Sequence, residues 1–190
     1  MNLAILASHN GSAFDYIIES KQQNLLPNIN LALVITNNSN ANIINKANKA
    51  NIPCIIINSK LYPDINLDEK IKDTLLQYKV DFVLLAGYMK KIGHEIVDSF
   101  SNKIINSHPA LLPKYGGVGM YGRFVHEAVL ANKEKYSGVT IHFVNNHYDE
   151  GEVILQKSIN IDSSWNEDKL EYNIKLLEKE AIIEVLGNLK

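Results

Sequence analysis

An asparagine and a histidine lie two residues apart near the middle of the chain, directly before a proline. The apolar residues Ile104 and Ile105 ahead of them predict a buried strand, and alternate side chains of a strand share a face. Asn106 and His108 can therefore point the same way, and Pro109 ends the strand because it has no N–H group to donate. A donor beside a group that titrates near neutral pH could carry acid–base chemistry. The alternative is an ordinary polar pair at a strand end.

Two polar turns could complete such a site. Residues 8–12, Ser-His-Asn-Gly-Ser, follow the first apolar run, and a turn that leads into a helix offers N–H groups to a phosphate. This turn has one glycine and lacks the full dinucleotide-binding pattern. Residues 148–151, Tyr-Asp-Glu-Gly, follow a later apolar run, and a carboxylate beside His108 would raise the imidazole pKa. Each stretch could equally be a plain turn.

His142 and His147 raise the question of a metal. They are five residues apart at the end of a predicted strand, and no matching set of cysteine or glutamate ligands accompanies them. We therefore expect no metal site.

The elements that must position these residues follow from the apolar pattern. Strands separated by helices of about ten residues form βαβ units, which predicts a parallel sheet with helices on both faces. After Pro113 the pattern changes to a glycine-rich loop, a helix, two alternating strands that suit an antiparallel pair, and a long helix. The expected strands are Leu3–Ala7, Leu31–Thr36, Pro53–Ile57, Phe82–Leu85, Ile104–Ile105, Gly138–Val144 and Val153–Ile161. The expected helices are one capped by Asn10 or Ser12 that runs through Ile18, then Ala41–Ala50, Leu67–Tyr78, Arg123–Asn132 and Trp165–Leu186.

The predicted fold class is therefore α/β: one doubly wound, mostly parallel sheet with an antiparallel C-terminal part and a long closing helix. We expect residues 1–190 to form a single domain, because the chain shows no internal repeat and no low-complexity linker.

Composition excludes several classes of function. A net charge of −2 gives no generally basic surface for nucleic acid, and the single cysteine, Cys54, excludes a disulfide within the chain. No apolar run reaches the roughly 20 residues of a membrane helix. The N-terminus lacks the basic region of a signal peptide. We expect a cytoplasmic monomer or homodimer that binds small molecules and neither nucleic acid nor membrane.

In this order and at these intervals, the three polar stretches resemble phosphoribosylglycinamide formyltransferases, the folate-dependent enzymes of purine synthesis, which have a Rossmann-like fold. The resemblance covers nearly the whole chain. It rests on residues 106–115 with Gly117, on residues 141–144 followed by 148–156, and on residues 84–92. The motif His-Pro-x-Leu-Leu-Pro is typical of enzymes that use 10-formyltetrahydrofolate. Several relatives carry an extra domain, which we do not expect here.

The resemblance implies transfer of a formyl group from 10-formyltetrahydrofolate, as co-substrate, to the amine of glycinamide ribonucleotide. It places Asn106, His108 and Asp149 at catalytic positions. The amide and a charged His108 would donate to the oxyanion of a tetrahedral intermediate, and Asp149 would stabilise the imidazolium. The implied ligand contacts are Asn10, Gly11 and Ser12 for the substrate phosphate, Met89, Lys90, Ile92, Val144 and Asn145 for the folate, and Gly87, Pro109 and Glu178 for the rest of the acceptor.

Some positions depart from the family pattern. His9 and Ala13 stand where the family has a glycine and an asparagine, and Lys175 replaces a glutamine. The arginine that meets the folate tail near residues 60–66 is absent, and Lys60 or Lys70 could substitute for it. Two alternatives stay open: a formyltransferase that acts on another amine, such as an amino sugar nucleotide, and a non-catalytic nucleotide-binding module.

Overall fold

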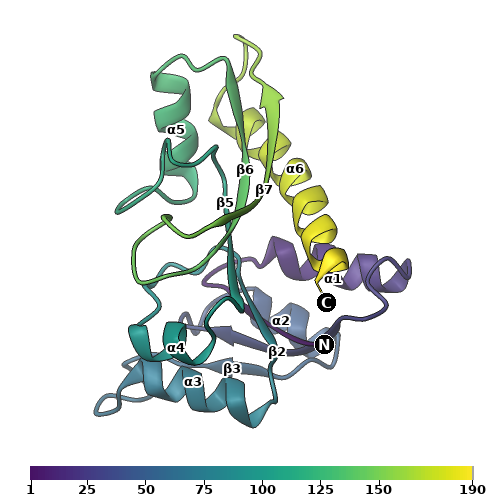
Figure 1. Ribbon diagram of the computed structural model, residues 1–190, viewed down its shortest axis with the longest axis vertical. Coiled ribbons are helices and arrows are strands. Elements are labelled where there is room, and N and C mark those ends of the chain that lie inside the picture. Colours follow the sequence, from purple (N-terminus) through teal and green to yellow (C-terminus); the bar gives the residue numbers. More distant parts are fainter. Residues whose placement is uncertain (190) are drawn as a thin grey trace. The chain divides into compact units, whose positions relative to one another are not determined.

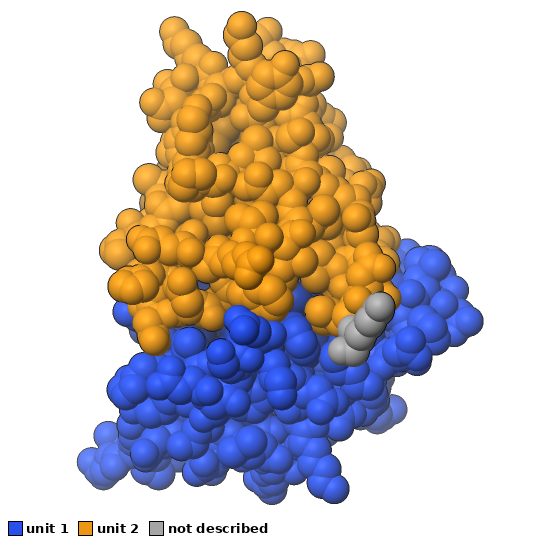
Figure 2. All heavy atoms as spheres, viewed as in Figure 1, with its two compact units in different colours: residues 1–105 blue, residues 106–190 orange. Residues whose placement is uncertain are grey.

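The computed structural model of the chain describes residues 1–189, which contain seven strands and six helices (Figure 1). The chain divides into two compact units, residues 1–105 and 106–190, coloured separately in Figure 2. The strand β5 (Ile104–His108) crosses the boundary between them. None of the helices in the described residues is long and apolar enough to pass through a membrane.

Unit 1 alternates strands with helices, as the apolar pattern predicted. Its strands pair in the order β3-β2-β1-β4, and every pairing among these four is parallel. The elements are β1 (Asn2–Leu6), α1 (Ser12–Gln22), β2 (Asn30–Thr36), α2 (Ile43–Lys49), β3 (Cys54–Ile56), α3 (Leu67–Gln77), β4 (Phe82–Leu85) and α4 (His94–Ser99).

The central strand β1 explains why the strands of this unit read as continuous apolar runs. Its side chains from Leu3 to Leu6 are 0% exposed, because both faces of a parallel sheet are covered. Helix α4 was not predicted from the sequence. It has only six residues, which is too short for a helical period to stand out in the sequence.

Helix starts in unit 1 use two different devices. The Asn66 side chain accepts hydrogen bonds from the N–H groups of Asp68 and Glu69 and so caps α3. The residue before α1 is Gly11, in the left-handed conformation with φ 63°, and no side chain caps that helix. Our expectation that Asn10 or Ser12 caps α1 was therefore wrong: Ser12 is already the first helical residue.

Unit 2 holds the last residues of β5 and the C-terminal elements. These are α5 (Arg123–Ala131), β6 (Tyr136–Phe143), β7 (Val153–Asn160) and α6 (Glu167–Asn188). Strands β6 and β7 pair antiparallel, with Thr140 opposite Gln156 and an irregularity between Ile141 and His142. The long helix α6 packs on both strands and on α5. The expected fold class, a mostly parallel α/β sheet with an antiparallel C-terminal pair and a closing helix, is confirmed.

The turn between β6 and β7 depends on a glycine. The Phe143 N–H donates to the Glu152 carbonyl at 2.9 Å and closes the turn. A Cβ atom at Gly151 would collide with the Phe143 carbonyl oxygen, so only glycine lets the two backbones approach this closely. This turn carries Asp149, and its path fixes where that carboxylate lies.

Candidate functional site

Three polar side chains meet at the end of β5 in unit 2. The Nδ2 atom of Asn106 lies 3.4 Å from Oδ1 of Asp149, and Nδ1 of His108 lies 3.6 Å from Oδ2 of the same carboxylate. Asn106 and His108 share a face of the strand, as the two-residue period predicted. The structure therefore brings together the three residues that the resemblance placed at catalytic positions.

Asp149 is held by the glycine-rich loop between β5 and α5. The Gly117 N–H donates to its Oδ2 at 2.9 Å. The Asp149 backbone has φ 56°, a left-handed conformation that aspartate adopts more readily than most L residues. The turn thus holds the carboxylate against His108.

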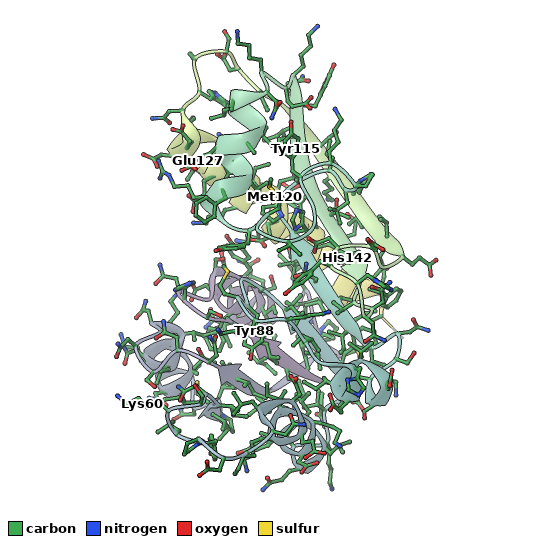
Figure 3. All side chains as sticks on the ribbon, turned by 90° about the vertical axis from the view of Figure 1, so that its left-hand side faces the viewer. Lys60, Tyr88, Tyr115, Met120, Glu127 and His142 are labelled. Atoms are coloured by element: carbon green, nitrogen blue, oxygen red, sulfur yellow. The ribbon has the colours of Figure 1, made fainter. Side chains whose placement is uncertain are left out.

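The partners of His108 indicate its tautomer. Nε2 lies 2.7 Å from the carbonyl oxygen of Tyr115, which can only accept, so Nε2 carries a proton. In the neutral ring Nδ1 is then the unprotonated nitrogen, and it faces Asp149. Figure 3 shows Tyr115 on the loop that follows β5.

Burial lowers the pKa of His108 below its ordinary value. The Asp149 carboxylate and the Tyr115 carbonyl both raise that pKa, but they do not offset the loss of solvent around a side chain that is 3% exposed. We expected a charged imidazolium. The direction of this shift favours the neutral ring, and the charged form that the resemblance implies stays a prediction for the catalytic step.

Asp149 stays ionised despite its own burial. Loss of solvent raises the pKa of the carboxyl, but the nearby side chains of His142 and His108 and the Gly117 N–H group lower it, and the balance falls below the ordinary value. A carboxylate beside a neutral imidazole can stabilise a proton that arrives on the ring.

His142, at the end of β6, is the residue that our sequence reasoning missed. It is 2% exposed, its Nε2 lies 3.1 Å from Nδ2 of Asn106 and 3.5 Å from Oδ1 of Asp149, and its Nδ1 lies 2.9 Å from the Phe143 carbonyl. We had considered it only as a metal ligand with His147, which is exposed. Within residues 1–189, no three histidine, cysteine or acidic side chains are grouped as a metal site would require.

The contacts of His142 orient the amide of Asn106. Nδ1 donates to the Phe143 carbonyl, and in the tautomer whose one proton is on Nδ1 the other nitrogen, Nε2, accepts from the NH2 group of the amide. One N–H group of the amide then donates to Nε2 of His142, and the other donates to Oδ1 of Asp149. Both N–H groups of the Asn106 amide are therefore hydrogen-bonded in the structure.

Glu178, expected to contact the acceptor, lies on α6 in the same unit. Its Oε1 accepts a hydrogen bond from the Ser107 hydroxyl at 2.7 Å. Burial raises the pKa of this carboxyl, while the Ser107 hydroxyl and Lys175 lower it without restoring the ordinary value. Pro109, Val144 and Asn145 also lie in unit 2, after β5 and after β6 respectively.

The residues expected to bind phosphate lie in unit 1, where α1 begins. Gly11 is buried against Ile43, and a Cβ there would collide with that side chain. Asn10 and the departing residue His9 are both exposed. The N–H groups of the first turn, at Ser12 and after it, provide the positive end of a helix dipole.

The expected folate residues of unit 1 are tied to the same turn through Ser8. The Ser8 N–H donates to the Gly87 carbonyl at 3.0 Å, and its hydroxyl accepts from the Met89 N–H at 2.8 Å. Ile92 is 5% exposed, whereas Lys90 is exposed.

Known proteins match this chain over nearly all of its length. A model of the formyl transferase family matches residues 1–186. The phosphoribosylglycinamide formyltransferase of Bacillus subtilis is 33% identical over 177 residues, which is 92% of this chain and 87% of that protein. The chloroplastic phosphoribosylglycinamide formyltransferase of Arabidopsis thaliana is 38% identical over 187 residues, 97% of this chain. A crystal structure of phosphoribosylglycinamide formyltransferase from Bacillus halodurans superposes with a TM-score of 0.89 at 29% identity, covering 98% of this chain and 94% of that one.

The plant relatives are longer than this chain. It spans 64% of the Arabidopsis protein and 59% of the one from Vigna unguiculata.

Proposed function

The chain belongs to the formyl transferase family, and from that membership and the site at the end of β5 we propose that it is a phosphoribosylglycinamide formyltransferase. It transfers the formyl group of 10-formyltetrahydrofolate to the amine of glycinamide ribonucleotide. One observation carries the proposal: an amide, a neutral imidazole and a carboxylate converge from β5 and from the turn after β6.

The reaction is a direct exchange of one C–N bond for another. The acceptor amine attacks the formyl carbon, a new C–N bond forms, and the carbonyl oxygen becomes an oxyanion. The Asn106 amide and the Nε2–H group of His108 donate to that oxyanion. These donors bond to His142, Asp149 and the Tyr115 carbonyl in the ligand-free protein, so the substrate must replace those partners.

The proton balance assigns a second role to His108. The attacking nitrogen loses a proton, which the neutral imidazole takes up, directly or through water. The Asp149 carboxylate, 3.6 Å from Nδ1, stabilises the imidazolium that forms. The proton then passes to N10 of the folate as the bond from the formyl carbon to N10 breaks. The products are the formylated amine and tetrahydrofolate, and no covalent enzyme intermediate forms.

The ligand contacts are part of the same proposal and rest on the resemblance. The substrate phosphate binds at Asn10, Gly11 and Ser12, supported by the open start of α1. The folate binds at Met89, Lys90, Ile92, Val144 and Asn145, and the rest of the acceptor at Gly87, Pro109 and Glu178.

We further propose that both units are parts of one formyltransferase domain, because the family model runs through both of them. The small-molecule partners follow from the proposed reaction. A cytoplasmic location stays a prediction, since the two plant relatives are chloroplastic by name. The choice between monomer and homodimer also stays a prediction.

The decisive experiment measures folate deformylation by absorbance, with and without glycinamide ribonucleotide. We expect turnover that depends on the acceptor. Asn106→Ala or His108→Ala should each lower kcat by roughly 10²–10³, because each removes an oxyanion donor, while folate binding by calorimetry persists. Wild-type turnover in both variants would contradict the assignment.

The same assay separates the alternatives. Deformylation without any acceptor indicates a hydrolase. Activity with an amino sugar nucleotide in place of glycinamide ribonucleotide indicates another acceptor. Nucleotide binding without any formyl transfer indicates a non-catalytic module.

A further inference from the structure

Ser107 stands between two proposed catalytic residues but faces the other side of β5. Its side chain is 7% exposed, and its hydroxyl donates to Oε1 of Glu178 at 2.7 Å. Asn106 and His108 reach the turn after β6, whereas Ser107 reaches helix α6. One strand end therefore fixes polar groups on both of its faces.

The Glu178 carboxyl depends on Ser107 for its one hydrogen bond within the described residues. In the part of the chain that the structure describes, Ser107 is the only hydrogen-bond partner of the Glu178 carboxyl. The second carboxyl oxygen, Oε2, is left without one. Glu178 is half-buried, and its Oε2 is not among the buried side-chain atoms that lack a partner, so this oxygen is open to solvent and a ligand can reach it.

We propose that Ser107 is a positioning residue that holds the Glu178 carboxyl so that Oε2 accepts a hydrogen bond from an amine or hydroxyl group of the acceptor substrate. The inference rests on the proposed function, which places the acceptor at Glu178. Ser107 itself touches no substrate: its effect passes through the carboxyl.

The charge of Glu178 provides a readout that simple packing would not move. Burial raises the pKa of this carboxyl, and the Ser107 hydroxyl and Lys175 act against that rise. Removing the hydroxyl should therefore raise the pKa further. A carboxyl that holds its proton to a higher pH is a poorer acceptor, so the acidic loss of acceptor affinity should begin at a higher pH.

The test compares Ser107→Ala with a rescue and a matched control. Ser107→Ala should raise the KM for glycinamide ribonucleotide about tenfold, since a hydrogen bond to a charged group is lost, and leave kcat and the KM for 10-formyltetrahydrofolate within about twofold. Ser107→Thr keeps the hydroxyl on a residue that suits a strand and should restore the wild-type KM. The control is Ser137→Ala on β6, because that residue is also buried, at 2% exposed against 7% for Ser107, but its hydroxyl has no hydrogen-bond partner in the structure.

A double-mutant cycle shows whether the effect passes through Glu178. In a Glu178→Gln background, Ser107→Ala should change the acceptor KM by less than about twofold. If the two substitutions raised the acceptor KM by independent factors that multiply, the proposal would be overturned. It would also be overturned if Ser107→Ala lowered the affinity for the folate as much as the affinity for the acceptor.

Carbon-13 NMR titration of the Glu178 carboxyl in the ligand-free protein keeps this inference separate from the proposed function. A higher pKa in Ser107→Ala than in wild type and Ser107→Thr supports the contact even if wild type fails to formylate glycinamide ribonucleotide. An unchanged pKa overturns it whatever the activity shows.

Discussion

The charge of His108 is decided by opposing influences on one buried ring. Burial lowers its pKa, and the Asp149 carboxylate and Tyr115 carbonyl raise it by less. A neutral histidine is the form that can accept the proton of the attacking amine. Activity should therefore be present above the pKa of His108 and be lost as the pH falls through it, at a lower pH than for an ordinary histidine.

Asp149→Asn tests how much the carboxylate raises the pKa of His108 against the effect of burial. The substitution removes a charge that raises the His108 pKa, so the pKa should fall further and the acid limb of kcat/KM should move to lower pH. The rate at the optimum should also fall, because only the Tyr115 carbonyl then stabilises the imidazolium. Proton NMR of the His108 ring, titrated in wild type and variant, checks the shift. A His108 pKa that rises in Asp149→Asn would contradict this account.

His142 should contribute to stability and turnover because it orients the Asn106 amide. His142→Phe keeps a flat buried ring but removes the acceptor at Nε2, so an N–H group of Asn106 loses its partner. We expect a loss of about 1–3 kcal/mol in the free energy of unfolding and a fall in kcat of roughly 10–100-fold, because the amide can then turn away. Urea unfolding and steady-state kinetics measure the two effects.

His147→Phe is the matched control, since His147 is exposed and lies outside the network around Asn106. Equal losses in the two variants would show that the His142 contact has no special role.

Among the elements, two helices of unit 1 begin at asparagines but use them differently. The Asn66 side chain caps α3 by accepting from two N–H groups, whereas Asn42, before α2, makes no side-chain capping bond. Residue type alone does not distinguish the two positions, because asparagine is favoured before the first helical residue in general.

The same substitution at both helix starts separates the two cases. Asn66→Ala should lower the free energy of unfolding by about 1 kcal/mol, and Asn42→Ala should change it by only a few tenths. Chemical denaturation of the two variants beside wild type gives the comparison. A larger loss at Asn42 would mean that the caps do not contribute as their hydrogen bonds indicate.

For the whole molecule, the open question is whether the two units unfold together. Strand β5 contributes residues to both, so unfolding either unit must break it. We expect a single cooperative transition in urea. Trp165, the only tryptophan, reports on unit 2 by fluorescence, and far-ultraviolet circular dichroism reports on both units. The two curves should coincide, and two separated midpoints would mean that the units are independent domains.

The sequence determined whatever depends on neighbouring residues. A two-residue period placed Asn106 and His108 on one face, and Pro109 ended the strand after them. Alternating apolar runs gave the parallel strands of unit 1. Local sequence pattern did not predict helix α4, because six residues are too few to show a helical period. It also gave the wrong cap for α1, where Gly11 precedes the helix and no side chain caps it.

Tertiary structure decided everything that joins distant parts of the chain. Asp149 reaches Asn106 across 43 residues, His142 reaches it across 36, and Glu178 reaches Ser107 across 71. No local periodicity encodes such pairs, because they depend on how strands and helices pack. The neutral state of His108 has the same origin: the residue type sets an ordinary pKa near neutrality, and only the burial created by folding moves it lower.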